Sequence, residues 1–149
     1  AGVLINKPFE ETSLIDWQNQ FNTNLFSVVN LVQLLLPNLK KSTNAHIVNI
    51  SSMAGFQSSK KFIGLSVYAA SKAALANLTE TLAVELKEYN IFCNCLCLGA
   101  VQTNMFAQAF PNLKATITPE TIAPFIANFA LTAQKIMNGK IIPVTASTP

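Results

Sequence analysis

The sequence has no arginine, one histidine and few charged side chains, and all ten of its basic residues are lysine. Arginine supplies the planar fork that pairs with phosphates and base edges, so its absence disfavours nucleic-acid recognition. The lysine pairs at 40–41 and 60–61 are isolated and are not interleaved with aromatic residues. We therefore predict no nucleic-acid partner.

Long apolar runs are also absent, since none approaches the about 18 residues needed to cross a bilayer. The N-terminus has neither the charged region nor the apolar core of a signal peptide. From these absences we expect a soluble, cytoplasmic protein with no membrane partner. Half of the residues are hydrophobic and only 11% are charged, which excludes a disordered chain and favours strands buried on both faces.

An initiating methionine is missing as well, and the chain opens directly on Ala-Gly-Val-Leu-Ile. This opening reads as the end of a buried strand. We therefore expect that an N-terminal part precedes residue 1.

The three cysteines, Cys93, Cys95 and Cys97, alternate within one apolar run. In a strand their side chains would run parallel on one face, a geometry that disfavours a disulfide. A zinc site would need a fourth ligand, and the only histidine is His46. The pattern favours buried free thiols in a reducing compartment and no metal site.

Hydrophobic periodicity and turn residues predict alternating strands and helices. The expected strands are residues 2–5, 46–51, 91–98 and 140–144, and the expected helices are residues 13–40, 67–89 and 119–131, with loops at 53–67 and 99–118, the second containing a short helical lid. This order predicts an α/β fold with a doubly wound parallel sheet of about four strands and helices on both faces. We see no repeat or linker, so residues 1–149 are taken as one domain.

The expected helix at residues 13–40 is apolar around most of its circumference from Phe21 onward. Such a helix is covered on more than one side. Burial within the chain and contact with a second subunit both explain this pattern, and both remain open at this stage.

The strongest chemical signal is Tyr68-Ala-Ala-Ser-Lys72, which places a phenol and an ammonium group four residues apart on one helix face. A nearby fixed positive charge favours the phenolate and is expected to lower the pKa of Tyr68 toward the working range. Ser52 ends the strand before this helix, at the sheet edge where ligands bind in such folds. These three groups could hold a carbonyl oxygen and exchange a proton with it, while a redox cofactor would have to supply the hydride.

These residues, with others in the same order, closely resemble the short-chain dehydrogenase/reductase family, in its single-domain, Rossmann-like branch. Besides Tyr68-x-x-x-Lys72, the matching segments are Ala1-Gly2, Asn24 in Phe21-Asn-Thr-Asn-Leu25, Ile47-Val-Asn-Ile-Ser-Ser-Met-Ala-Gly55, Asn94-Cys-Leu-Cys-Leu-Gly-Ala-Val-Gln-Thr103 and Asn138-Gly-Lys-Ile-Ile-Pro-Val144. Together they cover nearly the whole chain.

The resemblance implies catalytic roles for Asn24, Ser52, Tyr68 and Lys72. It places the active serine at Ser52 rather than Ser51, and it gives Asn24 a water chain leading to Lys72. Cofactor contacts are implied for Ala1, Gly2, Tyr68, Lys72, Gly99, Val101 and Thr103, the last two toward the nicotinamide carboxamide. The implied cofactor is NAD or NADP, and the implied partners are a small carbonyl or alcohol substrate and a second copy of the chain, in a homodimer or homotetramer.

Three departures from the family pattern stand out. Leu98 occupies the position of the family's proline, and the loop from Ser52 to Tyr68 is a few residues longer than is common. The Gly-rich phosphate loop, with the residue that selects NAD or NADP, would lie before Ala1.

The resulting prediction is an NAD(P)-dependent oxidoreductase that reduces a ketone or oxidises a secondary alcohol. The alternative is a binding or regulatory module that keeps the fold without turnover. An epimerase-type relative ranks last, because only 77 residues follow Lys72.

Overall fold

The computed structural model describes residues 2–146, and its centre is a sheet of three parallel strands in the order β1-β2-β3. These strands are β1 (His46–Ser52), β2 (Phe92–Leu98) and β3 (Ile141–Val144). The first pair runs in register from His46 beside Phe92 to Ser52 beside Leu98, and the second pair ends at Leu98 beside Val144. The predicted α/β fold with a parallel sheet is confirmed, and all three strands end at the same edge.

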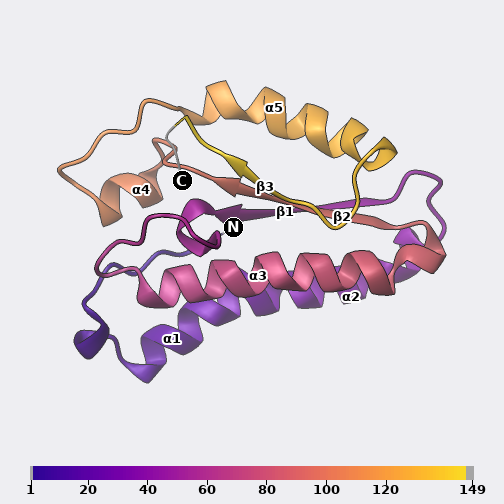
Figure 1. Cartoon of the computed structure of the whole chain (residues 1–149). Helices are drawn as coiled ribbons and strands as arrows, with labels where there is room; N and C mark the ends of the chain where they lie inside the picture. The colour runs from indigo at the N-terminus through magenta and orange to yellow at the C-terminus, as the bar shows by residue number, and fades with distance from the viewer. Residues whose placement is uncertain (1, 147–149) are drawn as a thin grey trace.

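Helices cover both faces of this sheet (Figure 1). The long helix α3 (Ser66–Glu85) lies on one face with α2 (Ser27–Leu39) beside it, and α5 (Pro119–Thr132) lies on the other face. The central strand β2 is buried on both sides, since Cys95 and Cys97 pack with Ala76 of α3 and Leu96 packs with Phe129 of α5. This two-sided burial explains why β2 reads as a continuous apolar run.

The three cysteines are free and buried, as predicted. Among the described residues no group of three or more histidine, cysteine or acidic side chains is placed to hold a metal ion.

The predicted strand at residues 2–5 is wrong, because these residues have no regular secondary structure in the chain. The Asn24 side chain forms hydrogen bonds with the backbone N–H and carbonyl of Val3, which a neighbouring strand would otherwise bond. It accepts a hydrogen bond from the Val3 N–H and donates one to the Val3 carbonyl, both at 2.9 Å. The segment is bound to the helix that carries Asn24, so the sheet has three strands within residues 2–146.

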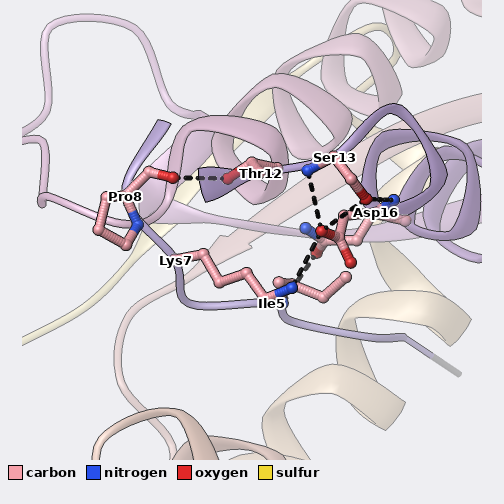
Figure 2. A network of polar contacts seen from close by, with 7 residues as sticks. Ile5, Lys7, Pro8, Thr12, Ser13 and Asp16 are labelled. Atoms are coloured by element: carbon pink, nitrogen blue, oxygen red, sulfur yellow. Dashed lines mark hydrogen bonds and ion pairs between the residues drawn. The ribbon is translucent and has the colours of Figure 1, made fainter. Parts of the chain in front are cut away.

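The predicted long helix from Ser13 begins as expected and is continuous through three segments. Helix α1 (Leu14–Phe21) leads into a π-helix, η2 (Asn22–Phe26), and then into α2. Ser13 caps α1 in a capping box with Asp16, and Lys7 forms an ion pair with the same carboxylate at 3.0 Å (Figure 2). Thr12 donates a hydrogen bond to the Pro8 carbonyl, which fixes the loop leading into the helix.

Helix α2 has no fully buried residue, although Leu36 and Leu39 pack against the core. On its outer side Leu34 is 77% exposed and Leu31 is 55% exposed. Burial within the described part of the chain therefore does not account for its apolar circumference.

The remaining elements are short, and four of them are 3₁₀-helices that the sequence did not predict. They are η1 (Phe9–Glu11), η3 (Met53–Gly55), η4 (Lys87–Tyr89), α4 (Asn104–Ala109) and η5 (Ala133–Lys135). Helix α4 is the short helix expected within residues 99–118, and it lies beyond the ends of β1 and β2 (Figure 1). Within residues 2–146 no helix has the length and apolarity required to pass through a bilayer.

Candidate active site

Ser52 is the last residue of β1, and its side chain caps the short helix η3 by accepting a hydrogen bond from the Ala54 N–H at 3.1 Å. Ser51, one residue earlier, points to the other side of the strand and is 4% exposed. Its hydroxyl donates to the Lys72 carbonyl at 2.8 Å, so it fastens β1 to α3. The geometry therefore leaves Ser52, and not Ser51, at the rim of the sheet.

Tyr68 lies in the first turn of α3 and is 6% exposed. Burial raises the pKa of its phenol, and a hydrogen bond with Ser52 opposes that rise. The structure thus brings Ser52 and Tyr68 together.

The expected lowering of the Tyr68 pKa is not what the structure shows, because desolvation is the larger effect. The Lys72 ammonium lies 5.9 Å from the phenol ring centre, where its charge is not the leading influence. Tyr68 is consequently a protonated acid at neutral pH in this structure.

Lys72 follows one turn later on α3 and is 7% exposed. Its ammonium donates a hydrogen bond to the Ile50 carbonyl of β1 at 3.0 Å. Burial lowers the pKa of Lys72, while the neighbouring Cys95 and Cys97 raise it. The ammonium has three N–H donors and the Ile50 carbonyl takes one of them, so it can hold further acceptors at the rim.

Asn24 lies in the π-helix η2 and is 1% exposed. Besides holding Val3, its amide donates to the Ser71 hydroxyl of α3 at 3.1 Å. A π-turn re-aims one side chain within a helix and is common at functional sites. In the structure Asn24 positions the N-terminal segment against the helix that carries Tyr68 and Lys72, while the water chain implied by the resemblance stays a prediction.

The predicted cofactor-binding residues lie along the same edge. Gly2 lies beside Asn24, and Gly99 follows β2, where its N–H donates to the Val144 carbonyl at 2.9 Å. Val101 forms an isolated bridge with Ile117, and the Thr103 hydroxyl caps α4 at the Phe106 N–H. Ala1 falls outside the described residues.

Leu98, at the position of the family's proline, continues the β2 ladder and packs in the core cluster around Leu96 and Phe129. The turn that follows still contains Gly99, where a side chain would meet the Thr145 hydroxyl at 2.6 Å. The departure at Leu98 thus contributes apolar packing and leaves the close contact at Gly99 intact.

Gly55 is a site residue whose role the sequence reasoning missed. A Cβ atom there would lie 2.5 Å from the Ala73 nitrogen and 2.6 Å from the Lys72 carbonyl carbon. Only glycine lets the turn after Ser52 rest directly on the backbone of α3. The signal was present in the motif Ser-Ser-Met-Ala-Gly, but the contact partner could not be read from it.

The sequence of residues 1–114 matches the family described as short chain dehydrogenase. The chain belongs to the short-chain dehydrogenase family. Human retinol dehydrogenase 8 is 39% identical over 121 residues, which are 81% of this chain and 38% of that protein. The ketoacyl reductase HetN of Nostoc is 38% identical over 128 residues, covering 83% of this chain and 43% of that protein.

Solved structures of family members share the fold. A short-chain dehydrogenase from Escherichia coli, solved with NADPH, superimposes with a TM-score of 0.85 at 30% identity and covers 96% of this chain and 59% of its own. A further Escherichia coli oxidoreductase gives a TM-score of 0.86 at 30% identity, over 96% of this chain and 58% of its own. The chain thus spans less than half the length of the curated relatives named above and about three fifths of these solved structures.

Proposed function

We propose that this protein is an NAD(P)-dependent oxidoreductase that reduces a ketone or oxidises a secondary alcohol. The observation that carries the proposal is the buried Tyr68 phenol, which is hydrogen-bonded with Ser52. The Lys72 ammonium lies one helical turn further along α3, 5.9 Å from the phenol ring centre. A buried acid beside a hydroxyl donor and a fixed cation is suited to protonating a developing alkoxide.

In the reducing direction, Ser52 donates a hydrogen bond to the substrate carbonyl oxygen and holds it against Tyr68. Tyr68 then transfers its phenolic proton to that oxygen, and the Lys72 ammonium stabilises the phenolate left behind. The raised pKa of Tyr68 suits this direction, because the phenol carries the proton that the product needs. In the oxidising direction the phenolate takes the proton back from the alcohol.

The residues at this edge fit the nicotinamide half of a dinucleotide. Lys72 has donors left for ribose hydroxyls, and at Gly2 an added Cβ would meet only Asn24 Oδ1 at 3.6 Å, so the backbone there is accessible to a ligand. Gly99, Val101 and Thr103 border the same space after β2. The bound nicotinamide would supply or accept the hydride. Relatives solved with NADPH and with NADP support this cofactor class.

The test mixes purified protein with NADH or NADPH and follows nicotinamide absorbance over a carbonyl panel that includes a retinoid aldehyde and a ketoacyl thioester, after the relatives' names. Tyr68→Phe is expected to lower kcat by about 10²- to 10⁴-fold with cofactor binding retained, because only the proton donor is lost. The matched control is Tyr89→Phe, which alters the chain's other tyrosine, 37% exposed on η4.

Unchanged turnover in Tyr68→Phe would refute the proposed mechanism. Cofactor binding without turnover on any substrate would instead support the binding-module alternative.

We also propose that the protein assembles as a homodimer or homotetramer in which the outer side of α2 meets a second copy. The exposed leucines of this helix support the proposal, since a soluble chain seldom leaves a row of large apolar side chains uncovered.

A further inference from the structure

Lys61 lies in the loop that follows Ser52, and its side chain folds back over the start of that loop. Its ammonium donates hydrogen bonds to the Ala54 carbonyl at 3.0 Å, to the Phe56 carbonyl at 2.6 Å and to the Ser59 hydroxyl at 2.9 Å. A lysine ammonium has three N–H donors, so these three acceptors use all of them. Although Lys61 is exposed, its ammonium therefore binds its own loop and has no donor left for a substrate.

Ser59 extends these contacts to the short helix η3. It is 7% exposed, and its hydroxyl lies 2.5 Å from the Met53 carbonyl and 2.9 Å from the Phe56 carbonyl. The preceding residue, Ser58, has a φ of 63°, in the left-handed region that residues with a side chain seldom adopt. Such a backbone conformation persists only where the surrounding structure holds it. The shape of the loop therefore depends on the contacts made by Ser59 and Lys61.

Ala54 links the Lys61 ammonium to the Ser52 hydroxyl. Its carbonyl accepts the hydrogen bond from Lys61, and its N–H donates one to the Ser52 hydroxyl oxygen at 3.1 Å. Because this N–H occupies a lone pair of the Ser52 oxygen, the hydroxyl proton is left for Tyr68 or for a substrate oxygen. The next residue, Gly55, lies directly against the backbone of α3, so the turn that carries Ala54 is held from both sides.

We propose that Lys61 is a positioning residue of this site: by binding the Ala54 carbonyl and the turn of residues 53–59, it fixes the orientation from which the Ser52 hydroxyl donates to the substrate oxygen. Lys61 acts through the backbone of Ala54 and not by its own contact with the substrate. The catalytic part of this inference rests on the function proposed above, whereas the role of Lys61 in holding the loop does not.

The first experiment measures kcat and cofactor affinity in Lys61→Met, which keeps the apolar part of the side chain and removes its three donors. We expect kcat for carbonyl reduction to fall about 10- to 100-fold, as when a catalytic group is displaced by about 1 Å. The Kd for NADH or NADPH should not change, because the three contacts of Lys61 lie within residues 54–59. Lys61→Arg should recover part of kcat, since it keeps the charge but spreads its donors over a planar fork.

The matched control is Lys60→Met, which removes the same charge from the neighbouring position of the same loop. The Lys60 ammonium lies over the Phe62 ring, 5.7 Å from the ring centre, and not over the turn that follows Ser52. This variant should keep the kcat of the wild-type protein.

A double-mutant cycle with Ser52→Ala distinguishes positioning of Ser52 from a general effect on the loop. If Lys61 acts through Ser52, adding Lys61→Met to Ser52→Ala should cost little further activity. Single turnovers at high enzyme concentration make the low activity of Ser52→Ala measurable. Additive losses would show that Lys61 acts elsewhere and would overturn its role toward Ser52.

A second measurement does not depend on turnover. The N–H of Ala54 donates to Ser52, and the N–H of Phe56 donates to the Met53 carbonyl at 3.1 Å, so both amide hydrogens are protected from exchange with solvent. In protein without cofactor, Lys61→Met should speed the exchange of both amides by about tenfold or more, because the turn opens more often. Lys60→Met should leave both rates unchanged, as measured by nuclear magnetic resonance.

The two measurements separate the two proposals. A protein in which Lys61→Met speeds amide exchange but which turns over no substrate would keep the role of Lys61 in the loop and refute the proposed function. Wild-type kcat in Lys61→Met, or amide exchange at Ala54 that this variant leaves unchanged, would overturn the role of Lys61. If Lys61→Met does not fold, Lys61→Gln, which is neutral and shorter, decides by the same two measurements.

Discussion

At the scale of single residues, the site depends on two close backbone contacts that tolerate only glycine. At Gly55 the turn after Ser52 lies directly against the α3 backbone, and at Gly99 the chain after β2 lies directly against Thr145. Both contacts lie next to residues of the candidate site, since Ser52 precedes the first and Val101 follows the second. The candidate site therefore depends on these two glycines as well as on its polar side chains.

We expect Gly55→Ala to destabilise the fold by about 1–3 kcal/mol, because the added methyl group would overlap backbone atoms of Lys72 and Ala73 that cannot yield. The turn that bears Ser52 would move away from Tyr68, so kcat should fall as well. Urea unfolding gives the stability and steady-state kinetics gives kcat.

The control for stability is Gly2→Ala, whose methyl group would meet only the Asn24 side chain at an ordinary 3.6 Å. Equal stability losses in the two variants would contradict the explanation by backbone overlap.

At the scale of elements, α5 is fastened to the sheet by a histidine that must stay neutral. One ring nitrogen of His46 lies 2.9 Å from the Ala130 carbonyl of α5, and the other lies 2.9 Å from the Asn94 amide of β2. The Asn94 amide also donates a hydrogen bond to the Met137 carbonyl and accepts one from the Lys140 N–H. These bonds position the residue that precedes β3. With Nδ1 as the donor, the second nitrogen accepts the amide hydrogen, and that requires the neutral ring.

Burial lowers the pKa of His46 below its ordinary value of 6.5. The unfolded chain therefore binds the proton more readily, so the contribution of His46 to stability is present above 6.5 and is lost as the pH falls through the lower folded pKa. We expect the free energy of unfolding to decrease as the pH falls from 7.5 to 5, measured by urea unfolding at each pH.

His46→Gln lacks the titrating ring and should remove this part of the pH dependence. The comparison is clean because His46 is the only histidine in the chain. An identical pH dependence in His46→Gln would show that the ring is not responsible.

At the scale of the whole molecule, the outer side of α2 exposes large apolar side chains that no other described part of the chain covers. Leu31, Leu34 and Leu35 are 55%, 77% and 43% exposed on this helix. Fully burying an exposed leucine contributes about 1.5–3 kcal/mol, and each of these partly exposed side chains would gain a share of that in proportion to its exposed area.

We expect Leu34→Glu to weaken self-association, because a carboxylate at the centre of the row would be desolvated in the assembly. Sedimentation velocity over a concentration series measures the change. Ile136→Glu is the control, since Ile136 is 82% exposed and follows η5 rather than lying on α2. A monomeric wild-type protein, or equal weakening by both substitutions, would contradict the proposed interface.

The sequence by itself determined the order of strands and helices after residue 13, the parallel sheet and the candidate residues Ser52 and Tyr68 that lie together at one edge. It could do so because apolar periodicity and turn residues are local, and because Tyr68 and Lys72 share one helix. The buried cysteines and the short helix at Asn104–Ala109 were readable for the same reason.

Only the tertiary structure decided what depends on contacts between distant segments. Residues 2–5 look like a strand locally, but Asn24, twenty-one positions away from Val3, takes their backbone groups. The pKa of Tyr68 is set by the burial that α3 and its neighbours create, which reverses the shift expected from the Lys72 spacing alone. Cys95 and Cys97 of β2 contact Ala76 only because the sheet packs against α3, and no spacing in the sequence records that contact.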